Sequence, residues 1–505
     1  MSIETTGQSG DGTQQEEPEP QVENILASRE AGGLIIRGSA LRLAASGAGI
    51  ALGVLTASLL LRHLGVDESG RYVTVTSLVA IATTIADAGL NVTGSRDLSL
   101  APPQRRRELI ANLLGLRLMI APVGLACVVA FAAVAGYPQR MVLGTLIAGT
   151  GMFVVAALDA LLLPLIVDLR NGRLAAMELI KQVVTVSCVA LLAAAGARLL
   201  PFFAVQIAVA AAALVAAPLL AGRHVFIAPR FERGTQRALI SVALPVAAAF
   251  VLGQIYFRVV MLVMSLVSNP HETGLFGGSL RATESLAMLA VMIASIALPL
   301  LTAAGRDDHE RLRYALQGLS EVAVICGVGL ILVTARAAPW VMSVIGGHQF
   351  RGAGAVLRIQ VAALMFIGLS QIWGATLIAL HRQRDLIVTN GAALLGVAIF
   401  AAVLVPASGA EGGAVATVAG DALLAGLILW RLYRRTDRVR LHARMLGKLA
   451  LATAVALVPL LISGLPDLVA AGLSGVLYVV VAQLIGLLPK EVPEALLRRR
   501  RAVAD

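Results

Sequence analysis

Residues 141–167 read MVLGTLIAGTGMFVVAALDALLLPLIV, a run of 27 positions in which Asp159 is the single charged side chain. A helix needs about 20 mostly apolar residues to cross the hydrocarbon core of a bilayer, so this run predicts a transmembrane helix. Thirteen similar runs accompany it, and the sequence predicts an all-α integral membrane protein with about 14 transmembrane helices. The predicted spans are Leu34–Leu64, Glu68–Gly94, Leu109–Ala135, Met141–Val167, Leu174–Ala195, Leu199–Ala221, Ala238–Val267, Gly274–Ala303, Ala315–Ala335, Ala353–Leu380, Leu386–Val405, Gly413–Trp430, Lys448–Ile462 and Leu468–Leu488.

The positive charge between these spans alternates from one gap to the next. The even-numbered gaps and the C-terminal tail hold 27 Lys and Arg residues, whereas the odd-numbered gaps hold 6. Short cytoplasmic loops retain Lys and Arg, so both termini are predicted to lie in the cytoplasm of a cell bounded by this plasma or inner membrane. The net charge of +11 is therefore assigned to topology and to anionic lipid headgroups, and nucleic-acid binding is not expected.

The composition, 58% hydrophobic and 14% charged, excludes an ordinary soluble protein of this length. The first thirty residues are the exception, because seven acidic side chains stand there among Gly, Gln and Pro. Such a segment cannot bury enough apolar surface to fold alone, which predicts a disordered acidic cytoplasmic tail over residues 1–30. Residues 490–505 form a basic cytoplasmic tail.

A short motif occurs twice, 204 residues apart, each time before a span that runs from outside to inside. Asp67–Tyr72 reads DESGRY and His271–Phe276 reads HETGLF, so both contain Glu-x-Gly-x-aromatic. The alternatives are a helix-start cap used twice by chance and a true internal repeat, which we favour because the two copies occupy matching places in the order of spans. Six spans separate the copies, so the two halves would be related by a pseudo-twofold axis along the membrane normal.

The repeat and the charge runs predict the domain organisation. We expect an N-lobe over residues 31–222 with spans 1–6, a cytoplasmic inter-lobe linker over 223–237, a C-lobe over 238–440 with spans 7–12, and an appended pair, spans 13–14, over 441–489.

Two stretches resemble a known family. The segment Leu61–Tyr72 with its continuation to Asp97, and the segment Phe350–Ile359 with its continuation to Arg384, resemble the polysaccharide flippases, the Wzx-like branch of the multidrug/oligosaccharidyl-lipid/polysaccharide (MOP) exporter superfamily. The resemblance implies two six-helix lobes around a central cavity that opens alternately to each side. It also implies a polyprenyl-diphosphate-linked oligosaccharide as cargo, flipped from the cytoplasmic to the outer leaflet for cell-surface polysaccharide export. The implied pathway partners are a polysaccharide polymerase and glycosyltransferases.

Two rival functions remain at this point: a multidrug or cation antiporter of the same superfamily, and a polyprenyl-dependent membrane glycosyltransferase. The arginines predicted to line the cavity argue against the antiporter, and the short outward gaps argue against the glycosyltransferase. The sequence contains no Walker A motif and no His-Glu-x-x-His, so we expect neither direct ATP use nor a metal or other cofactor, and no enzyme. The cycle would then be driven by an ion gradient or by the membrane potential.

Ionisable residues inside spans are costly and are therefore the candidate site residues. Arg258 in the seventh span lies about ten residues, or about 15 Å of helix, from the outer end, which is too deep for easy snorkelling. A diphosphate headgroup needs cations, and the planar guanidinium fork of Arg suits phosphate. The predicted substrate-binding residues of the central cavity are Arg258, Arg281, Arg42, Gln254 and Arg358. The structural alternatives are that Arg281 neutralises Glu284 and that Arg42 snorkels to the interface.

Buried acids are the candidates for binding a coupling proton or cation, and the candidates are Asp421, Asp87, Glu284 and Asp159. Each has a structural alternative, namely pairing with an Arg or Lys. We favour the functional interpretation for Asp421 because it lies near the middle of its span, and the structural one for Asp159.

Overall fold

The computed structural model describes residues 29–168, 170–221, 227–307, 309–380, 382–433, 443–462 and 464–487. Within these ranges the regular structure is helical, with no strand. The predicted acidic tail lies outside the described residues as far as residue 28, and the predicted basic tail lies outside them throughout. The helices are α1 (Arg29–Asp87), α2 (Leu90–Leu100), α3 (Pro103–Val134), α4 (Gln139–Val167), α5 (Asn171–Ala194), α6 (Leu199–Ala221), α7 (Arg233–Val267), α8 (Pro270–Asp307), α9 (His309–Gly346), a 3-10 turn (His348–Phe350), α10 (Ala353–Ala379), α11 (Gln383–Tyr433), α12 (Ala443–Leu461) and α13 (Asp467–Leu484).

Two helices contain a reversal of direction. At 1.5 Å per residue, the 59 residues of α1 would extend about 90 Å, roughly three times the thickness of the hydrocarbon core. The chain instead turns back at Gly65, whose φ of 74° is open to glycine but strained for other residues. In α11 the turn is made by Ser408 and Gly409. The predicted spans 1 and 2, and likewise 11 and 12, are therefore joined by tight turns.

Eleven helical segments among the described residues are long and apolar enough to cross a membrane. The two segments with reversals provide two crossings each. An all-helical membrane fold is thus confirmed, while the count of 14 spans stays a prediction.

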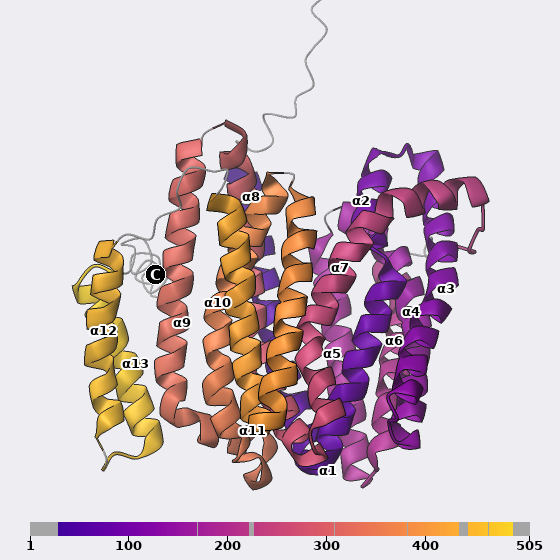
Figure 1. The fold of residues 1–505 in the computed structure, drawn as a ribbon. Helices are drawn as coiled ribbons and strands as arrows, with labels where there is room; N and C mark the ends of the chain where they lie inside the picture. Colours follow the sequence, from indigo (N-terminus) through magenta and orange to yellow (C-terminus); the bar gives the residue numbers. More distant parts are fainter. Residues whose placement is uncertain are drawn as a thin grey trace, which may run out of the picture.

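The helices form two bundles (Figure 1). The larger core joins α7 to α11 around residues such as Met261, Phe276 and Trp373, and it also includes Leu61 and Val73 of α1. The helices α1 to α6 share several smaller cores, for example Leu158 and Leu162 with Ala213. These two bundles are the N-lobe and the C-lobe.

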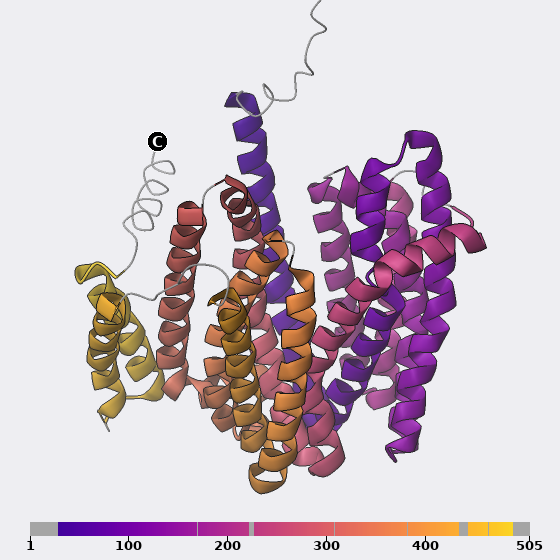
Figure 2. The same ribbon diagram turned by 45° about the horizontal axis from the view of Figure 1, so that its top comes forward.

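Helix α7 belongs to both lobes. Leu239 and Ala243 in its first half pack into an N-lobe core, whereas Tyr256 and Met261 in its second half pack into the C-lobe core. Pro245 lies between the two halves, and Figure 2 shows the first turns of α7 crossing the N-lobe helices before the helix turns down into the bundle. The predicted lobe boundary at residue 238 falls inside this helix.

The two lobes contact each other at the two copies of the repeated sequence motif. Gly70 of the first copy and Gly274 of the second are so close that a Cβ on Gly70 would lie 2.7 Å from the Gly274 nitrogen, and a Cβ on Gly274 would overlap the carbonyl oxygen of Val66. His271 and Asp67, which also occupy matching positions, lie 3.5 Å apart across the same boundary. Only glycine allows backbones to approach this closely, so the contact explains why both copies carry it.

The last two helices pack against the C-lobe as a hairpin. Met445, Leu449 and Tyr478 share a core with Ile325 and Leu332 of α9. At the turn of the hairpin, Arg336 of α9 bonds Asp467 at 2.9 Å and the Ile462 carbonyl at 3.1 Å.

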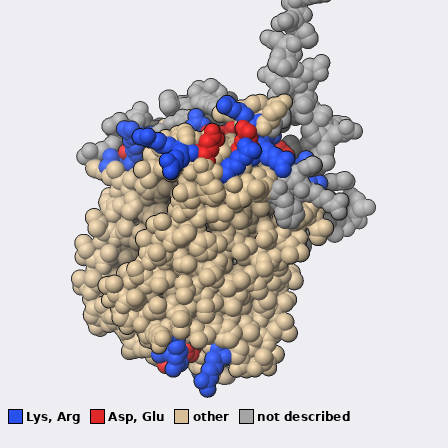
Figure 3. Space-filling view, turned by 90° about the vertical axis from the view of Figure 1, so that its right-hand side faces the viewer, with Lys and Arg blue, Asp and Glu red and all other residues tan. Residues whose placement is uncertain are grey.

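Charged side chains gather at the two ends of the molecule and leave a wide uncharged belt between them (Figure 3). On the face that Figure 3 shows, Lys and Arg are more numerous at the end where α1 begins than at the opposite end. We call these the basic end and the opposite end.

Candidate functional site

A cavity of about 460 Å³ lies inside the C-lobe between α7, α8, α10 and α11. This volume falls within the range of about 300–1,000 Å³ that is usual for small-molecule sites. Its polar lining combines two predicted substrate-binding residues, two predicted acids and four residues that were not predicted. They are Gln254, Arg258, Glu284, Asp421, Tyr256, Thr283, Gln360 and Thr417.

Arg258 is ion-paired with Glu284, and the same carboxylate is 3.2 Å from Arg281. The second terminal nitrogen of Arg281 donates to Thr76 of the N-lobe at 2.8 Å, so this network crosses the lobe boundary. Two guanidinium groups share one carboxylate, which leaves one excess positive charge. The side chains of Arg258 and Glu284 are 16% and 32% exposed, so the network is accessible from the space between the helices.

Gln360 is fully buried and is held by α8. Its side-chain oxygen accepts from Ser279 at 2.6 Å and from Thr283 at 3.4 Å. Its amide nitrogen has no partner among the described residues, and the same holds for the Nε of Arg258. Two N–H donors therefore remain unsatisfied at this cavity, which is costly unless a ligand or water accepts from them.

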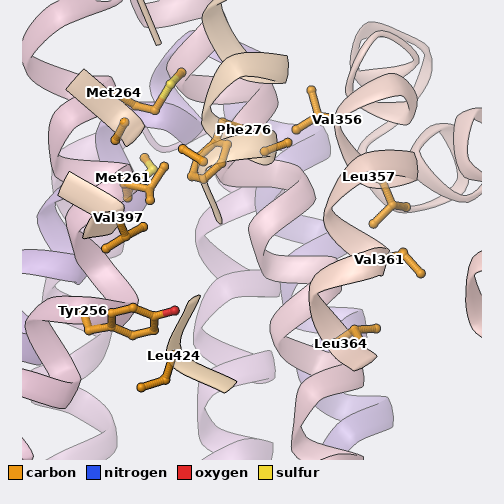
Figure 4. Packing of buried hydrophobic residues seen from close by; sticks show 14 of the residues in the cluster. Tyr256, Met261, Met264, Phe276, Val356, Leu357, Val361, Leu364, Val397 and Leu424 are labelled. Atoms are coloured by element: carbon orange, nitrogen blue, oxygen red, sulfur yellow. The ribbon is translucent and has the colours of Figure 1, made fainter. Parts of the chain in front are cut away.

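Asp421, 4% exposed, lies at the far side of the cavity. The hydroxyl of Tyr256 donates to it at 2.6 Å and fixes its position. Figure 4 shows Tyr256 below Met261, Phe276 and Val397, whose apolar side chains also line the cavity.

The N-lobe contains a different charge cluster. The side chain of Arg117 on α3 is 0% exposed and lies 2.8 Å from Asp87 and 3.8 Å from Asp159. Two predicted coupling acids are thus brought together by an arginine that the sequence analysis missed. The signal was available, because Arg117 lies well inside the predicted span Leu109–Ala135. Asp87 is also the last residue of α1, directly before the left-handed Ala88 and Gly89 that separate it from α2.

The other two predicted arginines do not join these clusters in the described part of the chain. Arg358 is exposed near the start of α10 and does not line the cavity. Arg42 lies in α1, but its side chain falls outside the described residues.

The described residues bring together no group of His, Cys, Asp and Glu that would hold a metal ion. The chemistry that the C-lobe cavity offers is instead non-covalent: the guanidinium of Arg258, two carboxylates, amide and hydroxyl groups for polar ligands, and an apolar wall.

Solved structures with similar folds are membrane transporters. A lipid II flippase MurJ in an inward closed conformation matches with a TM-score of 0.73 and 12% identity, covering 88% of this chain and 98% of that one. A multidrug resistance MATE family transporter of the MOP superfamily, in an inward-facing conformation, matches with a TM-score of 0.59 and 16% identity over 78% and 97% of the two chains. A MOP superfamily transporter from Pyrococcus furiosus, described as having a binding pocket of reverse polarity that suggests a different function, matches at 0.54 and 15% over 79% and 95%.

These likenesses confirm the predicted two-lobe fold. No curated protein sequence matches the chain. A family model described as polysaccharide biosynthesis protein matches residues 35–304, just over half of the 505 residues. This membrane protein with a MOP-type fold therefore belongs to the polysaccharide biosynthesis protein family.

Proposed function

We propose that this protein is a flippase that moves a polyprenyl-diphosphate-linked oligosaccharide from the cytoplasmic to the outer leaflet by alternating access. The family match supports a role in polysaccharide synthesis, and the fold supports transport of a substrate across the membrane.

The observation that carries the proposal is the network of Arg258, Glu284 and Arg281. Two arginines with one shared carboxylate keep an excess positive charge beside a polar cavity, and Arg281 links that charge to the N-lobe through Thr76. A diphosphate that enters between the lobes meets two guanidinium forks, each of which can bind phosphate oxygens in a bidentate manner. Displacing Glu284 from either fork would couple binding to a change in the lobe contact.

The alternative within the superfamily is a multidrug or cation antiporter. A site for organic cations needs an excess of acidic groups, and here the arginines outnumber the acid in the network that reaches the lobe boundary. This charge balance favours an anionic group at the lobe boundary, whereas the cavity lining itself, with Glu284 and Asp421 beside Arg258, has no positive excess.

The coupling of the cycle is assigned to the buried acids, with Asp421 as the first candidate because it is the most deeply enclosed. We place the protein in the plasma or inner membrane with both termini in the cytoplasm, beside the polymerase and glycosyltransferases that would consume and supply its cargo. A cysteine at Ser408 should then react with an impermeant thiol reagent added to intact cells, whereas one at Thr235 should not. The reverse labelling would overturn the orientation.

The test of function uses the full-length protein in liposomes. A fluorescent polyprenyl diphosphate that carries a sugar should move between leaflets without ATP. The movement is measured as the fraction of fluorescence that a reagent outside the liposomes can quench. An absolute requirement for ATP, or export of organic cations without movement of the lipid, would refute the proposal.

A further inference from the structure

The cavity of the C-lobe contains hydrogen-bonding groups that binding of a diphosphate does not use. Gln360 lies on α10, and its side chain is 0% exposed. Because its oxygen accepts from Ser279 and Thr283, the amide is held in one orientation, and its buried N–H₂ group has no partner among the described residues.

The unsatisfied groups indicate what kind of ligand fits. Gln360 Nε2 and Arg258 Nε are both donors, so they call for acceptor atoms and give no attraction to a bare cation. The carboxylate of Asp421 in the same cavity is an acceptor that holds a single hydrogen bond from Tyr256. A hydroxyl group satisfies both requirements, since it accepts from an amide and donates to a carboxylate.

The wall of the cavity fits the same ligand. Met261, Phe276 and Val397 add apolar surface to the lining of the cavity, and Figure 4 shows these three side chains above Tyr256. A pyranose ring has two such sides, with hydroxyl groups at its edge and C–H groups on its face. The volume of about 460 Å³ limits the occupant to a small group rather than a whole oligosaccharide.

We propose that this cavity binds the sugar attached directly to the diphosphate of the cargo, and that Gln360 recognises one of its hydroxyl groups. The inference rests on the proposed function, because it takes the diphosphate to lie at Arg258 and Arg281. Arg258 lines the cavity itself, so a sugar joined to a diphosphate at that residue would lie beside the polar groups of the cavity. Gln360 would then determine which lipid-linked cargo is accepted.

The experiment compares two fluorescent probes in liposomes that contain the full-length protein: a polyprenyl diphosphate with one hexose and the same lipid without a sugar. Wild type should move the hexose lipid faster. Gln360→Leu should slow the hexose lipid by about tenfold and leave the sugar-free lipid unchanged, because one hydrogen bond to the sugar is lost. Gln360→Glu keeps the oxygen that Ser279 binds and removes the free N–H₂ donor, so it should give the same selective loss without a packing defect.

Gln371, half-buried on the same helix and outside the cavity, provides the matched control, and Gln371→Leu should behave as wild type. Equal slowing of both probes by Gln360→Leu and Gln360→Glu would assign Gln360 to the transport cycle and overturn the proposal. No slowing of either probe would mean that the cavity holds only water, and would overturn it as well. A wild-type protein that moves neither probe refutes the proposed function itself, which is a separate result.

Discussion

The two lobes share a pseudo-twofold arrangement but hold opposite charge balances. In the N-lobe one arginine, Arg117, lies between two carboxylates and is completely enclosed. In the C-lobe two arginines flank one carboxylate, Glu284, and all three side chains are partly exposed.

This difference separates a structural cluster from an exchangeable one. An ion cluster whose central charge has no access to ligand or water cannot change partners without opening the protein, so Arg117 is expected to hold α1, α3 and α4 together. A partly exposed network can exchange Glu284 for a phosphate, because the ligand replaces the lost charge. The same fold thus provides a fixed cluster in one lobe and a binding cluster in the other.

Breaking the N-lobe cluster should have the largest effect. Arg117→Ala removes the shared partner of Asp87 and Asp159, whose side chains are 25% and 30% exposed, and removing one partner of a buried ion pair costs up to about 3–5 kcal/mol. We expect a sharp loss of protein from the membrane, measured by fluorescence-detected size exclusion. The triple change with Asp87→Asn and Asp159→Asn should recover part of the abundance. Normal abundance of Arg117→Ala alone would contradict the structural assignment.

The next effect concerns the contact that joins the lobes at the opposite end. Gly274→Val adds a side chain where the Val66 carbonyl oxygen lies, so the lobes cannot close there. Flipping should be lost while abundance is kept. A reporter cysteine at Met288, in a background without Cys127, Cys188 and Cys326, should become more reactive from the outer side.

The control is Gly472→Val on α13, where nothing lies within 4 Å of the new Cβ. Wild-type flipping by Gly274→Val would show that the glycine contact is not required for the cycle.

Most of the fold was predictable from the sequence because a bilayer imposes a simple rule on length and polarity. The Glu-x-Gly-x-aromatic motif, which the sequence indicated as an internal repeat, lies at the place where the lobes touch. The reversals inside α1 and α11 fall within the predicted gaps between spans. The turn at Ser408 and Gly409 is made by only two residues, so this gap has almost no polar signal. The first half of α7 was not predictable, because an apolar stripe does not show which lobe it packs against.

The charged residues of the candidate site were predictable from the sequence, but the contacts between its residues were not. Arg258, Arg281 and Glu284 were singled out because charge inside a span is rare, and spacing on one helix put the last two on one face. The hydrogen bond from Tyr256 to Asp421 joins residues 165 positions apart, and Gln360 is a neutral residue in an apolar run. No rule based on charge alone finds either one.

Substitutions of Arg258 in the C-lobe network should have an intermediate effect on flipping. They distinguish a residue that binds substrate from one that only neutralises Glu284. If Arg258 holds the diphosphate, flipping should fall from wild type to Arg258→Lys and further to Arg258→Ala, by about tenfold or more for Ala, with abundance unchanged. If Arg258 only neutralises Glu284, its removal should lower abundance, and the double change Arg258→Ala with Glu284→Ala should restore it. A restored and fully active double variant would end the claim that Arg258 binds substrate.

The smallest effect is expected at Arg358, which the sequence placed in the same set as Arg258. Arg358 is exposed near the start of α10 and does not line the cavity, so Arg358→Ala removes a charge from the surface of the C-lobe. Surface substitutions of this kind usually change stability by no more than about 0.5 kcal/mol. Flipping and abundance should both stay within about twofold of wild type, measured in the same liposomes and by the same size-exclusion assay. A loss as large as that of Arg258→Ala would mean that cargo contacts the C-lobe on a second face, and the contrast between an enclosed N-lobe cluster and a single C-lobe binding cluster would no longer hold.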